Sequence, residues 1–234
     1  QEMKGPLAVL GAVAAVFAVV VTIAAYKGFT IMGAVGLAAG VWVILSSLWD
    51  PVQRWRRKQT ISRGLAGMAL AHLGVGVFAI GVTVVQMYKI EKDIALKPGE
   101  SYTLQDYTFT FNGTKQLEGP NYTAIQSEVT ITRDGKVISV QHPQKRVYRV
   151  QKSPMTEAGL EWTWNRDLFV AMGEDLGGGS WSLRLQYKPL IRFIWLGAII
   201  MAFGGLLAIT DRRFLRQRAP ASDKVGAPGT VNAT

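Results

Sequence analysis

The chain has 234 residues, 49% of them hydrophobic, with 26 lysines and arginines against 16 aspartates and glutamates. It contains no cysteine, which excludes disulfides, thiolate metal ligands and catalytic thiols. A formal net charge of +10 would suit a nucleic-acid-binding protein, so the positions of the basic residues have to be established first.

Four apolar segments are long enough to cross a membrane, because a hydrocarbon core of about 30 Å needs roughly 20 apolar residues in a helix. The segments are 7–25, 29–48, 65–87 and 190–209. Pro189 precedes the last segment, and proline is tolerated in a first helical turn. Small residues in these segments predict closely packed helices, with chance spacing as the alternative reading. The residues are Gly36, Gly40, Ala198 and Ala202.

The basic residues lie on one predicted side of the membrane. The loop 50–64 has five basic residues and one acid, and the tail after Ile209 has five basic residues and two acids. Segment 89–188 is nearly neutral, with 13 basic and 12 acidic residues. The positive-inside rule therefore predicts a cytoplasmic loop, a disordered cytoplasmic tail over 211–234 and an outer domain over 89–188. The net positive charge is thus explained by the orientation of the chain in the membrane, and we expect no nucleic-acid partner.

The outer domain has the pattern of a small β-sandwich or barrel inserted between the third and fourth helices. Asp134-Gly135 is typical of a tight hairpin turn. Short runs of β-branched and aromatic residues predict the strands. They are 107–111, 124–132, 137–141, 147–151, 160–164, 168–172 and 181–187. The predicted fold class is thus an α-helical transmembrane bundle of four spans that carries a β-rich domain. Three spans, 7–25, 29–48 and 65–87, lie within residues 1–88, and the fourth lies within 189–210.

His72 is the strongest candidate for chemistry, because it lies seven residues into the third span and ionisable residues inside spans are usually functional. At 1.5 Å per residue it is about 10 Å deep, on a face of small and apolar residues with no carboxylate. Two interpretations remain open, ligation of haem iron or a hydrogen bond to another helix. The other histidine, His142, is expected in a solvated turn.

No other pattern in the sequence indicates an active site. There is no Ser/His/Asp arrangement, carboxylate pair at helical spacing, phosphate-binding loop or dinucleotide fingerprint. Asp167, Glu174 and Asp175 are expected to be solvated rather than catalytic. The sequence therefore predicts no catalytic residue.

Three long stretches resemble the CcmF/NrfE family of cytochrome c-type biogenesis proteins. They are MALAHLG (68–74), the run from KRVYRV to FVAMGE (145–174) and the run from WSLRLQ to AITDRR (181–213). The resemblance implies a haem lyase subunit in the bacterial inner membrane, with its β domain in the periplasm. Such proteins receive haem, a transient substrate, from a haem chaperone. With other lyase subunits, they help attach it to the CxxCH motif of apocytochrome c.

The resemblance also implies that His72 is one axial ligand of a b-type haem, which reduces the transferred haem, and that the second ligand lies outside this chain. Family members are several hundred residues longer and carry a tryptophan-rich segment with two flanking histidines that this sequence lacks. The chain thus resembles the C-terminal portion, which without the N-terminal part is not expected to be active alone. The alternative function is a non-catalytic, membrane-anchored binding or assembly module, or a haem transport subunit.

Overall fold

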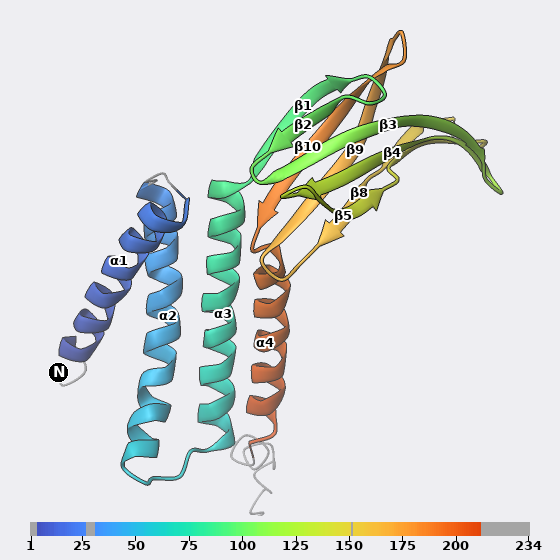
Figure 1. The fold of residues 1–234 in the computed structure, drawn as a ribbon. Coiled ribbons are helices and arrows are strands. Elements are labelled where there is room, and N and C mark those ends of the chain that lie inside the picture. The colour runs from blue at the N-terminus through green and yellow to red at the C-terminus, as the bar shows by residue number, and fades with distance from the viewer. Residues whose placement is uncertain (1–3, 27–30, 151, 212–234) are drawn as a thin grey trace, which may run out of the picture.

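The computed structural model describes residues 4–26, 31–150 and 152–211. Helices stand side by side and a β domain extends from one end of the third and fourth (Figure 1). The helices are α1 (Lys4–Tyr26), α2 (Ile31–Arg56), α3 (Arg63–Tyr88) and α4 (Ile191–Ile209). Three of them, α2 to α4, are long and apolar enough to cross a membrane, and the apolar stretch described in α1, Gly5–Val21, is shorter. Residues 27–30, where the first two predicted spans meet, and the tail beyond Asp211 lie outside the described residues.

Glycines hold α3 against α4 at backbone contact. A Cβ atom added to Gly74 would lie 2.6 Å from the Met201 nitrogen, and one added to Gly204 would lie 2.3 Å from the Ala71 nitrogen. These distances are too short for any side chain, so glycine is required where the helices cross. On α3, Gly67, Gly74 and Gly81 recur every seven residues, and Gly197 and Gly204 on α4 have the same spacing. Small residues permit this approach without a hydrophobic driving force.

On its other side, α3 packs against α2 through Gly36 and Gly40. A Cβ at Gly40 would lie 3.1 Å from the Gly76 carbonyl oxygen, so the predicted close approach at GLAAG is confirmed. In the last helix the prediction was wrong for Ala202, which is exposed. Gly197 and Gly204 make the close contacts with α3 instead.

The β domain is a sandwich of two antiparallel sheets. One sheet has the order β1-β10-β9-β8, and the other has β2-β3-β4-β6-β7 with β5 paired to β4. Its core lies between the sheets and is formed mainly by Phe109, Phe111, Ile131, Leu183 and Leu185, all fully buried. The strands are β1 (Ile90–Leu96), β2 (Ser101–Leu104), β3 (Tyr107–Glu118), β4 (Tyr122–Arg133), β5 (Lys136–Gln141), β6 (Gln144–Tyr148), β7 (Pro154–Glu157), β8 (Gly159–Trp162), β9 (Arg166–Gly177) and β10 (Ser180–Pro189).

The predicted hairpin turn between β4 and β5 is confirmed. Asp134 and Gly135 both have positive φ, 50° and 74°, as a type I′ turn requires. The strand predicted at 147–151 was misplaced, since β6 ends at Tyr148. Three strands were missed altogether: β1 and β7 are rich in charged or polar residues, and β2 has only four residues.

Helices and strands join without intervening loops where the sandwich meets the bundle. Strand β1 begins two residues after α3 ends, and β10 leads into α4 through Leu190. Leu190 has a left-handed φ of 52°, and its N–H donates to the Asn165 carbonyl at 2.9 Å. Pro189 is the last residue of β10 and precedes the last helix, as predicted.

Candidate functional site

His72 lies on the face of α3 that neither α2 nor α4 covers. Gly74 contacts α4 and Gly76 contacts α2, whereas His72 is exposed between them, beside Met68 and Val75, which are 51% and 43% exposed. The burial expected for His72 is therefore wrong for the described chain. Within the described residues, the His72 side chain is therefore exposed at the edge of the contact between α2 and α3.

One ring nitrogen of His72 is engaged by its own helix. Nδ1 lies 2.9 Å from the Met68 carbonyl oxygen, and the tautomer that carries a proton on Nδ1 donates to it. Metal-bound histidines commonly donate one ring N–H to a carbonyl in this way, which orients the ring and leaves Nε2 to bind the metal. The local geometry therefore fits an axial ligand.

A cavity of about 430 Å³ lies beside His72 and is closed on its other side by α2. Helix α2 contributes Ser46, Ser47 and Asp50, and α3 contributes Met68 with His72. Both serine hydroxyls donate to carbonyls of their own helix, at 3.1 and 2.8 Å, and Asp50 pairs with Arg54 at 3.2 Å. Sequence reasoning found no carboxylate near His72, because it considered only the residues of α3.

This arrangement offers one imidazole ligand on an open, mostly apolar face. Such a face would suit a flat macrocycle such as haem, with His72 holding the iron and the apolar side chains packing against the ring. The only other histidine in the sequence, His142, is exposed in the β domain, so this chain would supply no second imidazole to a group bound at His72.

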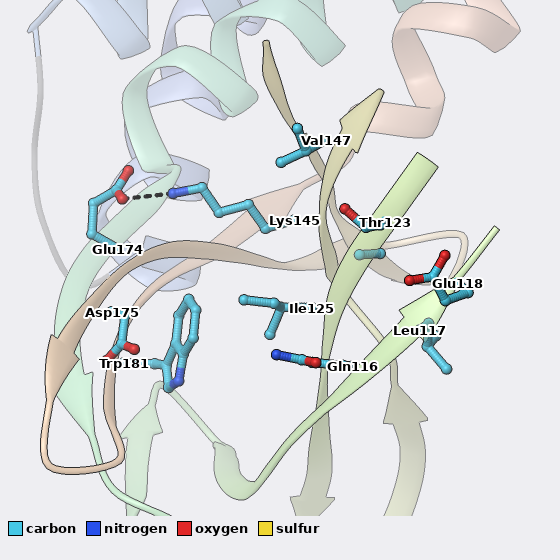
Figure 2. Close-up of a pocket in the computed structure, with 11 residues that line it drawn as sticks. Gln116, Leu117, Glu118, Thr123, Ile125, Lys145, Val147, Glu174, Asp175 and Trp181 are labelled. Atoms are coloured by element: carbon cyan, nitrogen blue, oxygen red, sulfur yellow. Dashed lines mark ion pairs between the residues drawn. The ribbon is translucent and has the colours of Figure 1, made fainter. Parts of the chain in front are cut away.

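A second cavity, of about 590 Å³, opens between the two sheets (Figure 2). Ile125, Leu117 and the buried Trp181 line its apolar part, and at its edge Lys145 pairs with Glu174 at 2.7 Å. The Glu174 side chain is 81% exposed, as predicted for a solvated residue. No pair of lining residues has the arrangement of a nucleophile and its base.

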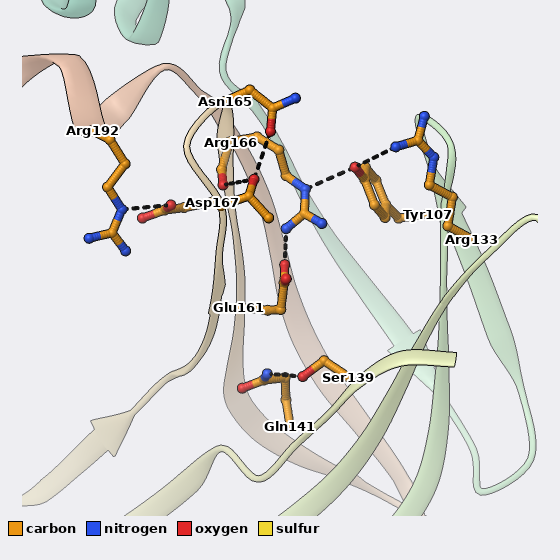
Figure 3. Close-up of polar contacts among 10 residues, drawn as sticks. Tyr107, Arg133, Ser139, Gln141, Glu161, Asn165, Arg166, Asp167 and Arg192 are labelled. Atoms are coloured by element: carbon orange, nitrogen blue, oxygen red, sulfur yellow. Dashed lines mark hydrogen bonds and ion pairs between the residues drawn. The ribbon is translucent and has the colours of Figure 1, made fainter. Parts of the chain in front are cut away.

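A polar network closes the end of the sandwich next to α4 (Figure 3). The buried Arg166 forms an ion pair with Glu161, and its Nε donates to the Tyr107 hydroxyl at 2.8 Å. Asp167 is only 4% exposed and accepts from Arg192 Nε at 3.4 Å. The prediction that Asp167 is solvated was wrong. Burial raises the pKa of its carboxyl above the ordinary value, although Arg192 opposes the shift.

Comparison with known proteins agrees with this architecture. Residues 87–189 match the family model described as the CcmF C-terminal beta-sandwich. The chain is 45% identical, over 179 residues, to the cytochrome c-type biogenesis protein CcmF of Pseudomonas fluorescens, a match that covers 74% of the chain. The chain belongs to the CcmF family. A solved structure named cytochrome c heme lyase CcmF superposes with a TM-score of 0.71 over 87% of the chain and 34% of its own, at 19% identity, and therefore supports the fold.

The chain is also similar to a relative of a second name, NrfE. The NrfE protein of Haemophilus influenzae is 37% identical over 177 residues, which is 76% of the chain. The chain spans about a quarter of the length of these relatives, 27% for both the Pseudomonas fluorescens CcmF and the NrfE protein. It corresponds to the C-terminal portion of a CcmF-family protein.

Proposed function

We propose that the chain is the C-terminal part of a haem lyase subunit for cytochrome c maturation, and that His72 is one axial ligand of a b-type haem in the membrane. The observation that carries the proposal is the state of His72. Its Nδ1 lies 2.9 Å from the Met68 carbonyl oxygen, which leaves Nε2 of this exposed side chain available to bind a metal.

The neighbouring side chains support the same role. Met68 and Val75 extend the exposed apolar face above and below His72 and would exclude water from a macrocycle bound there. Glycine contacts with α4 fix the rotation of α3 about its axis, so His72 cannot turn inward without moving both helices. When bound, haem supplies one-electron redox chemistry, which these residues would hold in place.

The proposal extends to partners and location. The names of the relatives connect this family to cytochrome c biogenesis and to a haem lyase. The N-terminal part of the same protein would supply the second axial ligand. A haem chaperone, other lyase subunits and apocytochrome c would complete the pathway at the periplasmic face of the bacterial inner membrane. The positive-inside rule supports this side for the β domain.

The test is His72→Ala in the full-length protein, followed by an absorption spectrum of the purified protein and an assay of cytochrome c maturation. Loss of the ligand should lower b-haem content several-fold while protein abundance stays near normal. Free imidazole should restore part of the spectrum, because it can occupy the vacated coordination position.

His142→Ala provides the matched control, since His142 is the only other histidine in this sequence and is exposed in the β domain. It should leave the haem spectrum unchanged. A normal b-type spectrum with full maturation in His72→Ala would refute the ligand assignment and leave His72 as an interhelical hydrogen-bonding residue. A full-length parent that binds no haem would instead favour a non-catalytic assembly module.

A further inference from the structure

Strand β8 has its apolar residues on the outside and its charged residue on the inside. Leu160 and Trp162 are 42% and 58% exposed, whereas Glu161 between them points inward and pairs with Arg166. A half-buried strand normally alternates in the opposite sense, with apolar residues toward the core. The outer face of this edge strand is therefore built for surroundings less polar than water.

The turn after β8 continues the same surface. Trp164 is 72% exposed and lies between Thr163, whose hydroxyl donates to Asn165 Oδ1 at 2.7 Å, and Asn165 itself. The turn is thus held by its own hydrogen bonds, while the largest apolar side chain in it stays uncovered. Together, Leu160, Trp162 and Trp164 form one exposed apolar surface, here called the β8 corner.

Contacts with α4 fix the β8 corner at the level where the chain enters its last apolar helix. The Asn165 carbonyl accepts from the Leu190 N–H at 2.9 Å, immediately before α4 begins. The Arg192 guanidinium lies 4.4 Å from the centre of the Trp162 ring. Arg192 Nε also lies 3.4 Å from Asp167 Oδ1, as Figure 3 shows. The corner therefore cannot move away from the first turn of α4 without breaking these contacts.

Below the corner, α4 presents an exposed stripe that continues into the membrane. Trp195 and Ile199 follow Arg192 at spacings of three and seven, on the side away from α3, and are 67% and 52% exposed. An arginine stacked on a tryptophan, with a second tryptophan one turn deeper, is the composition of an interfacial belt, where amphipathic rings prefer the headgroup layer. The exposed apolar surface of α4 is thus continuous with that of the β8 corner.

We propose that the β8 corner inserts into the headgroup layer of the phospholipid bilayer and anchors the β8 edge of its sheet on the membrane. The anchor would shield the apolar side chains of an edge strand from water. It would also hold the sandwich at a fixed tilt relative to α4.

The test places a fluorescent label in the corner and another far from the membrane. Trp164→Cys and Leu176→Cys are each introduced into the full-length protein, freed of other cysteines, and labelled with an environment-sensitive nitrobenzoxadiazole dye. Leu176 is 55% exposed near the β9–β10 turn, and that turn is separated from α4 by the ten residues of β10, about 33 Å of extended chain. The proteins are then placed in phosphatidylglycerol/phosphatidylcholine nanodiscs containing lipids with nitroxide quenchers in the headgroup or at carbon 12 of the acyl chain.

The label at residue 164 should be quenched at least about twofold by the headgroup nitroxide and less by the deep one, as expected for the interfacial layer. The label at residue 176 should be quenched by neither. Leu160→Cys provides a second label site if Trp164→Cys fails to fold. Equal lack of quenching at the corner and at residue 176 would overturn the proposal, whether the corner then proves open to a water-soluble quencher or covered by another part of the protein.

Discussion

Two aspartates in the same sheet show how strongly position changes the chemistry of one residue type. Asp93 is exposed on β1 and accepts two hydrogen bonds from Arg184, at 2.8 and 3.0 Å, and this contact lowers the pKa of its carboxyl. Asp167 on β9 is buried beside Arg192, and burial raises its pKa. Both aspartates have an arginine partner, so desolvation decides the direction of the shift at Asp167.

The raised pKa of Asp167 gives a pH-dependent prediction. The folded protein binds the Asp167 proton more tightly than the unfolded chain, so ionisation above the ordinary pKa of 3.8 destabilises the fold, and this cost is absent at lower pH. Asp167→Asn removes the ionisation. Its melting temperature relative to the wild-type protein should therefore rise between pH 4 and pH 7, as measured by thermal unfolding of the full-length protein.

Asp93→Asn is the control with the opposite sign. The pKa of Asp93 is lowered, so its ionised form stabilises the fold above pH 3.8, and that stability is lost as pH falls through the lower folded value. The variant should be slightly less stable than wild type at pH 7 and should approach it in strong acid. A gap between Asp167→Asn and wild type that is independent of pH would contradict the assigned shift.

At the scale of elements, the contact between α3 and α4 depends on glycine at particular positions. A Cβ at Gly204 would lie 2.3 Å from the Ala71 nitrogen, whereas a Cβ at the adjacent Gly205 would meet nothing within 4 Å. Gly204→Ala must push the helices apart and should destabilise the protein by about 1–3 kcal/mol, the usual range for overpacking. Gly205→Ala should be neutral or stabilising by up to about 1 kcal/mol, because alanine favours helix. The two variants are compared by their unfolding midpoints in denaturant. Equal destabilisation of both would mean that the helices are not in backbone contact at Gly204.

Patterns confined to one element were predictable from the sequence, and contacts between elements were not. The long apolar runs predicted the helices, and Asp134-Gly135 predicted its hairpin, because each signal is local. Strand β1 was missed because Glu91, Lys92 and Asp93 give it no apolar alternation. Ser46 and Asp50 were missed as neighbours of His72 because they belong to another helix. The glycines of α4 could have been found by their spacing of seven residues.

For the whole molecule, the charge pattern predicts which side of the membrane each part occupies. Thr60, in the loop between α2 and α3, and Ser101, in the β domain, are both exposed and therefore suit single-cysteine labelling. With an impermeant thiol reagent on cells whose outer membrane is permeabilised, Ser101→Cys should label and Thr60→Cys should label only after lysis. The reverse pattern would invert the topology.

The sandwich and the helical bundle are joined by two connections, one from α3 to β1 and one from β10 to α4. The two connections lie side by side. Helix α3 runs into β1, β10 runs into α4, and Ile90 pairs with Tyr187 just above the point where α3 and α4 meet through glycine. An antiparallel strand pair thus continues an antiparallel helix pair with no flexible connection between them. The strand pair and the helix pair would therefore move together as one rigid unit. A small rocking of α3, the helix that carries His72, would therefore be magnified into a larger sweep at the β9–β10 turn, the far end of the sandwich.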